Sequence, residues 1–189
     1  MTILSLGVVL WAAIHMFPAY APATRADWAG RLGEERWRGV FSLAILATIG
    51  LMIWGWHASA GAGFVWSPPL WMWHVNNLLM VGAMITLGAG HMKSNLRRHL
   101  RHPMLTAALL WAVAHLLANG DLRSVALFGG LGLWAVAAQI LANRRDGPWE
   151  RPPASPRRKD VLAVVAGVAV YGVVALLHPW VFGVSPFPV

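Results

Sequence analysis

The sequence predicts an all-α integral membrane protein, a bundle of about six transmembrane helices in one domain covering residues 1–189. Apolar runs long enough to cross a bilayer recur along most of the chain. The mean hydropathy is +0.57. Charged residues make up only 12% of the chain, whereas a soluble domain carries about 25%. The expected spans are residues 3–20, 40–57, 70–92, 104–118, 123–142 and 161–182.

The loops between these spans alternate in charge. Residues 21–39, 93–103 and 143–160 carry the whole net charge of +8. By the positive-inside rule, these three loops face the cytoplasm and both termini lie outside. The basic residues form no stripe with exposed stacking aromatics, so the charge does not indicate nucleic-acid binding. The chain has no cysteine, which excludes disulfides, thiolate metal sites, iron–sulfur clusters and a cysteine nucleophile.

The first span is expected to be a retained helix. Ala19-Tyr20-Ala21 looks like a signal-peptide cleavage site. However, no positive charge precedes the apolar core, and His15 interrupts it.

The fourth and fifth spans are expected to form a helical hairpin. Pro103 suits the first turn of a helix over residues 104–118. That helix would cover about 22 Å, less than the ~30 Å of a hydrocarbon core. Asn119-Gly120-Asp121 is a tight-turn signal. Capping is the simplest role for Asn119 and Asp121, and Asp121 is expected to pair either with Arg123 or with the region of His115.

The later part of the chain carries two further signals. Gly129, Gly130 and Gly132 predict close packing of the fifth span against a neighbour. Four prolines between residues 148 and 156 predict an extended, non-helical loop.

His15 and His115 are the histidines that fall well inside the predicted hydrocarbon region. An ionisable side chain at such a depth indicates a functional site. Two neutral imidazoles on separate helices at similar depth suit the axial ligation of haem iron. Trp11, Phe17, Trp111 and Leu116 would suit a porphyrin wall. The alternative is that each histidine bonds only a carbonyl or hydroxyl group on a neighbouring helix.

The other histidines lie nearer the membrane surfaces. His57, His74 and His178 fall on the outer side and could supply three nitrogen ligands to a second metal, although contact with water and headgroups is the simpler interpretation. His91 lies at the cytoplasmic edge. His99 and His102 lie in a basic loop suited to anionic lipid.

The string RHPMLTAALLWAVAHLLANGDL resembles the signature of the NnrU family of bacterial inner-membrane proteins. The first helix with His15, followed by RLGEERWRGVFSLAILATIGLMIWGW, resembles that family's amino-terminal half. The family is found with nitrite and nitric oxide reduction genes, which implies a link to denitrification. NnrU proteins are similar to zeta-carotene isomerase, a membrane haem b protein with two histidine ligands.

The resemblance implies a haem b site with His15 and His115 as iron ligands. Arg101 and His102 match the shared Arg-His-Pro and would position a haem propionate or an anionic ligand. Trp111 and Asn119 complete the expected cofactor-binding residues. No catalytic residue is assigned, because isomerase, oxidoreductase and electron-transfer roles stay open. An electron donor or denitrification proteins are the implied partners.

Two alternatives remain. Membrane methyltransferases that use S-adenosylmethionine also carry Arg-His-Pro, here at residues 101–103. They have a late acidic pair, which RRDGPWERPPASPRRKD lacks. A non-catalytic assembly or transport factor for nitric oxide metabolism, with structural histidines, is the second alternative.

Overall fold

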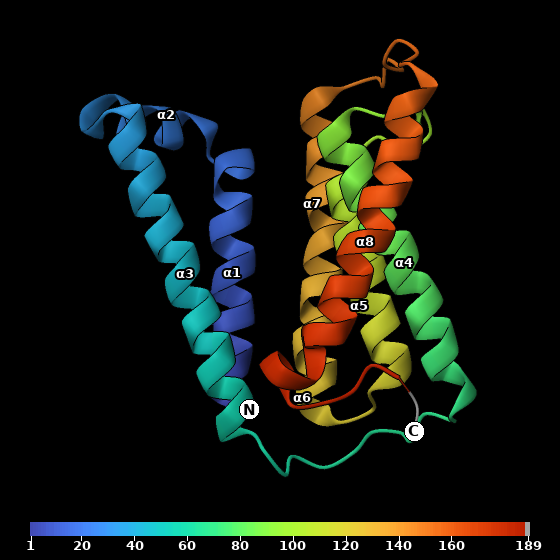
Figure 1. Cartoon of the computed structure of the whole chain (residues 1–189). Coiled ribbons are helices and arrows are strands. Elements are labelled where there is room, and N and C mark those ends of the chain that lie inside the picture. The colour runs from blue at the N-terminus through green and yellow to red at the C-terminus, as the bar shows by residue number, and fades with distance from the viewer. Residues whose placement is uncertain (188–189) are drawn as a thin grey trace. The chain divides into compact units, whose positions relative to one another are not determined.

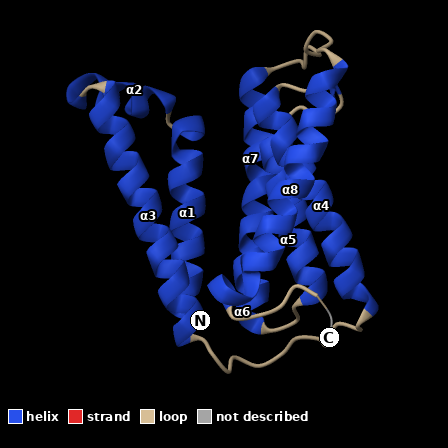
Figure 2. Ribbon diagram, in the orientation of Figure 1, coloured by secondary structure: helices blue, strands red, loops and turns tan. Residues whose placement is uncertain are grey.

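The computed structural model describes residues 1–187 and is helical over 79% of its length, with no strand in that range. Figure 2 shows helices joined by loops. All six predicted spans coincide with helical segments. Four segments are long and apolar enough to cross a membrane among the described residues: α1 (Thr2–Tyr20), α3 (Glu34–Ala58), the segment Leu122–Asp146 and α8 (Arg157–Phe182). The protein is therefore a membrane protein, and the count of six spans stays a prediction.

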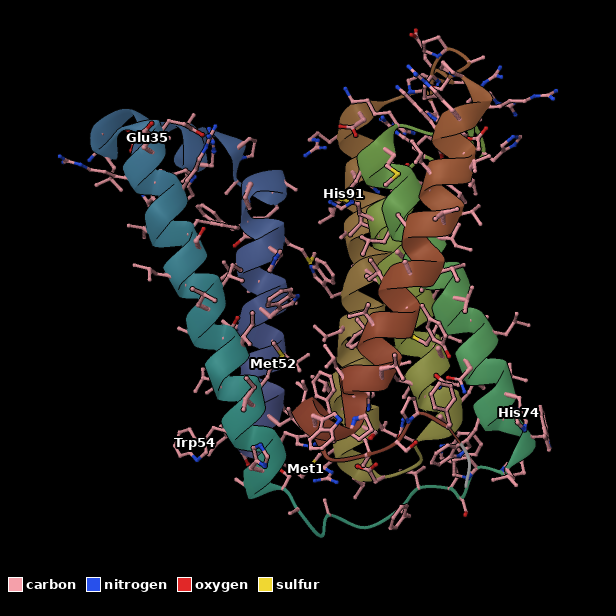
Figure 3. All side chains as sticks on the ribbon, in the orientation of Figure 1. Met1, Glu35, Met52, Trp54, His74 and His91 are labelled. Carbon is pink, nitrogen blue, oxygen red and sulfur yellow. The ribbon has the colours of Figure 1, made fainter. Side chains whose placement is uncertain are left out.

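The other two predicted spans are α4 (Trp71–Met92) and the shorter apolar helix α5 (Pro103–Ala118). Pro103 occupies the first turn of α5 as predicted. A short 3-10 helix, η1 (Asn95–Arg98), connects them. His74 and His91 mark the two ends of α4 in Figure 3.

The prediction that residues 21–39 form a loop was wrong. The segment contains α2 (Pro22–Leu32), and α3 begins at Glu34. Pro22 lies in the first turn of α2, where its missing N–H costs nothing. Arg31 pairs with Asp27 one turn earlier, and Arg25 pairs with Glu34. The charges that suggested a loop therefore support a polar helix.

The chain divides into two compact units. The first unit consists of Met1–Val65 and Asp121–Asp146, and the second of Trp66–Gly120 and Gly147–Val189.

The first unit is built on α1 and α3, which run side by side (Figure 1). Small residues permit this approach, because a Cβ atom on Gly55 would lie 2.5 Å from the Cα atom of Leu4. Leu4, Val8 and Met52 form the buried core there.

The segment Leu122–Asp146 completes the first unit by packing against α1. It consists of α6 (Leu122–Ser124), a π-helical turn η2 (Val125–Gly129) and α7 (Gly130–Asp146). Gly130 makes the predicted close approach, since a Cβ atom there would lie 2.5 Å from Val8 Cγ1. Gly129 has no neighbour of this kind within 4 Å. The sequence did not predict the π-helical turn.

The second unit packs α5 and α8 against α4. A Cβ atom on Gly167 of α8 would lie 2.6 Å from the Cα atom of Ile85, so the two backbones touch at this point. The proline-rich loop after α7 is non-helical, as predicted.

The side chain of Asn95 in η1 binds the end of that proline-rich loop and the start of α8. Asn95 Nδ2 donates to the Ser155 carbonyl (2.8 Å) and to Asp160 Oδ2 (2.7 Å). Asn95 Oδ1 accepts from the Ser155 N–H (2.8 Å). We call this group, Asn95, Ser155 and Asp160, the loop clasp.

Candidate functional site

Each unit contains a histidine four residues after a tryptophan, in WAAIH (residues 11–15) and WAVAH (residues 111–115). His15 Nδ1 lies 3.0 Å from the Trp11 carbonyl oxygen, and His115 Nδ1 lies 2.9 Å from the Trp111 carbonyl oxygen. A carbonyl oxygen only accepts hydrogen bonds, so Nδ1 is the donor in both rings. In the neutral imidazole, Nε2 is then the basic nitrogen, which is the state of a histidine that ligates a metal.

Both carbonyl partners come from the histidine's own helix. His91 makes the same bond to Leu87 at 3.0 Å, but its ring is exposed at the end of α4. His15 and His115 are half-buried. This bond is therefore common to histidines in these helices and does not mark a site by itself. His15 and His115 differ from His91 in being half-buried.

The His15 ring lies in an aromatic cluster of the first unit. Its centroid is 3.9 Å from that of Trp11 and 5.2 Å from that of Trp134. The Nε1–H donors of both tryptophans are buried and have no partner among residues 1–187. Unpaired buried donors are rare and costly. The cluster thus contains two N–H groups for which residues 1–187 supply no acceptor.

In the second unit, His115 lines a cavity of about 120 Å³ between α4, α5 and α8. Its polar lining includes His178 and four side chains that the sequence did not single out: Asn76, Asn77, Tyr171 and Ser185. A signal was available, because two adjacent asparagines inside an apolar span are unusual.

Asn119 lies beside His115 and caps the end of α5. Its backbone N–H and its side-chain Nδ2 both donate to the His115 carbonyl oxygen, at 2.9 and 2.8 Å. It also lines the cavity. The Trp111 ring lies 5.1 Å from the His115 ring.

Arg101 and His102 lie where η1 leads into α5. Arg101 Nη2 donates to the Gly147 carbonyl (2.8 Å). The carbonyl of His102, the N-cap residue, accepts from the Thr106 N–H (2.9 Å).

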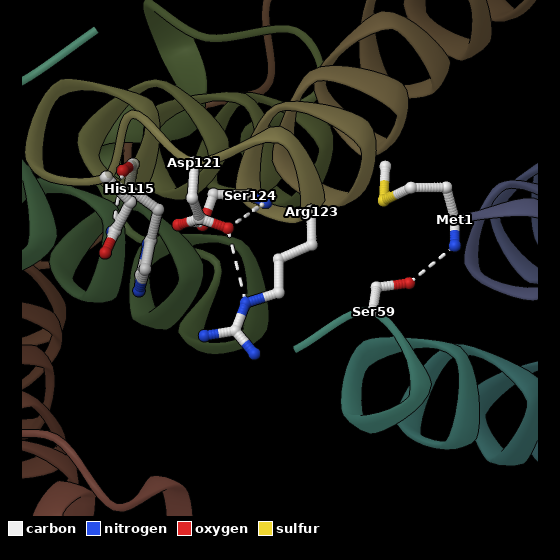
Figure 4. A network of polar contacts seen from close by, with 7 residues as sticks. Met1, Ser59, His115, Asp121, Arg123 and Ser124 are labelled. Carbon is white, nitrogen blue, oxygen red and sulfur yellow. Dashed lines mark hydrogen bonds and ion pairs between the residues drawn. The ribbon is translucent and has the colours of Figure 1, made fainter. Parts of the chain in front are cut away.

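Asp121 has the capping role and pairs with Arg123, which decides between the two partners expected for it. It accepts from the Ser124 N–H (3.0 Å), the Ser124 hydroxyl (2.6 Å) and Arg123 Nε (3.3 Å). Figure 4 shows these bonds. The Arg123 guanidinium also lies 4.3 Å from the Trp56 ring centroid.

No group of three or more histidine or acidic side chains suited to a metal ion occurs among residues 1–187. The optional second metal site at His57, His74 and His178 therefore finds no support.

The family model described as NnrU protein matches residues 3–186. The chain belongs to the NnrU family. The resemblance carried by the Arg-His-Pro segment and by the helix of His115 is thereby confirmed, and the NnrU match extends through α8. No curated protein and no solved structure matches the chain.

Proposed function

We propose that this NnrU protein binds haem b in the bacterial inner membrane and that His15 and His115 are its iron ligands. The observation that carries the proposal is that both rings are half-buried and donate from Nδ1 to their own helix, a combination that exposed His91 lacks. This bond fixes ring orientation and leaves Nε2 as the ligating nitrogen. When bound, haem supplies one-electron redox chemistry, and its reduction potential depends on its axial ligands and on burial.

Other residues near His15 and near His115 fit a haem group. Haem carries carboxylates, and the unpaired N–H donors of Trp11 and Trp134 need an acceptor. Arg101 and His102 lie outside these two groups of residues, at the opposite end of α5 from His115, and are proposed to hold a propionate or another anionic ligand, because a guanidinium can bind a carboxylate through two hydrogen bonds. Trp111 and Asn119 position His115 from its own helix.

The chain's role would then be electron transfer, redox sensing or gated chemistry on a small ligand or lipidic substrate, linked to nitrite and nitric oxide metabolism. Iron held by two histidines has no open position until one of them leaves. We therefore propose no oxygen-carrier role. Both termini are proposed to be periplasmic, with the basic loops in the cytoplasm.

The test is an ultraviolet–visible spectrum of the purified protein, first oxidised and then reduced with dithionite. We expect a Soret band and sharp reduced α and β bands, typical of six-coordinate haem b. His115→Ala and His15→Ala should each lower haem occupancy at least tenfold. His57→Ala, at an exposed histidine on α3, should leave occupancy unchanged.

A featureless spectrum after haem supplementation would overturn the proposal and favour an assembly or transport factor. Equal occupancy in the His115→Ala and His57→Ala variants would remove the ligand assignment. Saturable binding of S-adenosylmethionine by the colourless protein would favour the methyltransferase. The sequence offers that alternative little support, because residues 144–160 carry single acids and no acidic pair.

A further inference from the structure

Asn76, a residue that lines the cavity of the second unit, has a buried acceptor atom without a donor among the described residues. Asn76 is 8% exposed. Its Oδ1 atom accepts no hydrogen bond from any residue in the described part of the chain. Asn76 lines the cavity. An unpaired buried carbonyl oxygen is unfavourable unless something in the cavity donates to it.

The neighbouring polar side chains already have partners. Asn77 Oδ1 accepts from the Tyr171 hydroxyl (3.0 Å), and Asn77 Nδ2 donates to the Pro186 carbonyl (3.0 Å). Asn119 Nδ2 donates to the His115 carbonyl. These bonds hold the wall of the cavity in place, and they leave the Asn76 oxygen as a fixed acceptor.

The lining indicates an uncharged ligand, because it contains no aspartate, glutamate, lysine or arginine. An ion in such surroundings would lose its hydration without gaining a counter-charge. The rest of the wall is apolar, formed by residues such as Trp73, Met80, Val174 and Ala175.

The volume indicates the scale of the ligand. An apolar cavity of about 150 Å³ holds benzene, and this one measures about 120 Å³. The ligand is therefore about the size of one small ring or a short branched chain, and it is a molecule other than haem.

The carboxyl-terminal segment covers the cavity. Residues 184–186 contribute to the lining. His178 Nδ1 donates to the Val184 carbonyl (2.8 Å), and Asn77 holds the Pro186 carbonyl. The segment is tied down at two points, so the cavity is a built site and not a gap left by a loose end.

We propose that this cavity binds a small neutral molecule bearing a hydroxyl group, and that the hydroxyl donates to Asn76 Oδ1. The inference goes beyond haem binding, because its acceptor lies on α4 and needs no iron. The ligand would lie beside His115, which lines the same cavity.

The test titrates the purified full-length protein in lipid nanodiscs with para-fluorophenol and with fluorobenzene. The two probes share a ring and differ by the hydroxyl. Binding is read by fluorine NMR against empty nanodiscs, which corrects for partition into lipid. We expect saturable binding of para-fluorophenol about tenfold tighter than that of fluorobenzene, because one hydrogen bond to a buried acceptor is gained.

Two variants locate the effect. Asn76→Leu should abolish the preference for the hydroxyl probe. Thr86→Val is the matched control, since Thr86 is a buried polar residue of the same helix that does not line the cavity. It should keep the preference.

Equal binding of the two probes by the wild-type protein would overturn the proposal, and so would a preference that survives Asn76→Leu. The first comparison needs no variant, so a folding failure of Asn76→Leu does not remove the test. A trapped water that satisfies Asn76 would also give equal binding.

The result is separable from the haem proposal. His15 lies in the other unit, so His15→Ala should lower haem occupancy and leave probe binding unchanged. A colourless protein that still prefers para-fluorophenol would overturn the haem proposal alone.

Discussion

Asn119 Nδ2 donates to the carbonyl oxygen of His115 at 2.8 Å, on the peptide group of the proposed ligand itself. The Asn119 backbone N–H bonds the same oxygen. Asn119 thus caps α5 by bonding the carbonyl oxygen of His115, a residue that also lines the cavity. The cap and the candidate site therefore share one peptide group.

We expect Asn119→Ala to lower the free energy of unfolding by about 1 kcal/mol, because one hydrogen bond at a half-buried helix end is lost. The same variant should weaken haem retention. Both are measured on detergent-solubilised protein, by denaturant titration and by the Soret absorbance after dilution. Ser42→Ala, at an exposed polar position of α3, is the control. An unchanged unfolding midpoint in Asn119→Ala would show that the bond contributes nothing.

Gly55 and Gly50 form a matched pair on α3. A Cβ atom on Gly55 would lie 2.5 Å from the Cα atom of Leu4, whereas no atom lies within 4 Å of one on Gly50. We expect Gly55→Ala to destabilise the protein by about 1–3 kcal/mol, because the backbones of α1 and α3 must separate. Gly50→Ala should stabilise it by about 0.5–1 kcal/mol through helix propensity. Thermal or denaturant unfolding measures the sign of the stability change in each variant. Equal changes in Gly55→Ala and Gly50→Ala would contradict the close approach of α1 and α3.

Gly167 and Gly172 test the second unit in the same way. A Cβ atom on Gly167 would lie 2.6 Å from the Ile85 backbone, and Gly172 has open space. Gly167→Ala should lower the melting temperature and Gly172→Ala should not. If Gly167→Ala melts like the wild type, then α4 and α8 do not pack at this distance.

The loop clasp predicts a local effect. Asn95→Ala removes the bonds to Ser155 and Asp160, so residues 147–156 should open without global unfolding. We expect faster chymotryptic cleavage after Trp149, read by mass spectrometry of the fragments. Ala154→Ser changes an exposed residue of the same loop and should cleave at the wild-type rate. Equal cleavage rates in the two variants would show that the Asn95 side chain does not restrain the loop.

Hydrophobic runs were enough to predict the long helices, because a span of twenty apolar residues has few alternatives to a helix. The same rule failed at α2. It treats charged residues as loop, whereas Arg31 and Asp27 pair along one helix face. The π-helical turn at Val125–Gly129 carries no sequence signature of this kind.

The candidate site was predictable only in part. Depth along the chain singled out His15 and His115, and the spacing of each from a tryptophan was visible in the sequence. The cavity was not predictable, because Asn77 and Tyr171 are 94 residues apart and meet only in the folded unit. The bond from His178 to the carboxyl-terminal segment likewise depends on how the chain turns after α8.

The buried indole N–H of Trp134 gives the sharpest test of whether a group binds next to His15. The donor has no partner among the residues described, and its ring lies 5.2 Å from that of His15. In the haem-free protein, Trp134→Phe removes an unsatisfied polar atom, so the free energy of unfolding should stay equal or rise. In the haem-loaded protein, the same change should weaken haem binding about tenfold to 150-fold, the loss of about 1.5–3 kcal/mol expected for one hydrogen bond to a charged acceptor. Trp54→Phe, at a tryptophan that is 61% exposed on α3, should change neither quantity.

Competition with apomyoglobin measures haem affinity. Unchanged affinity in Trp134→Phe would mean that the indole does not donate to haem, because the variant keeps the ring contact with His15 and loses only the N–H.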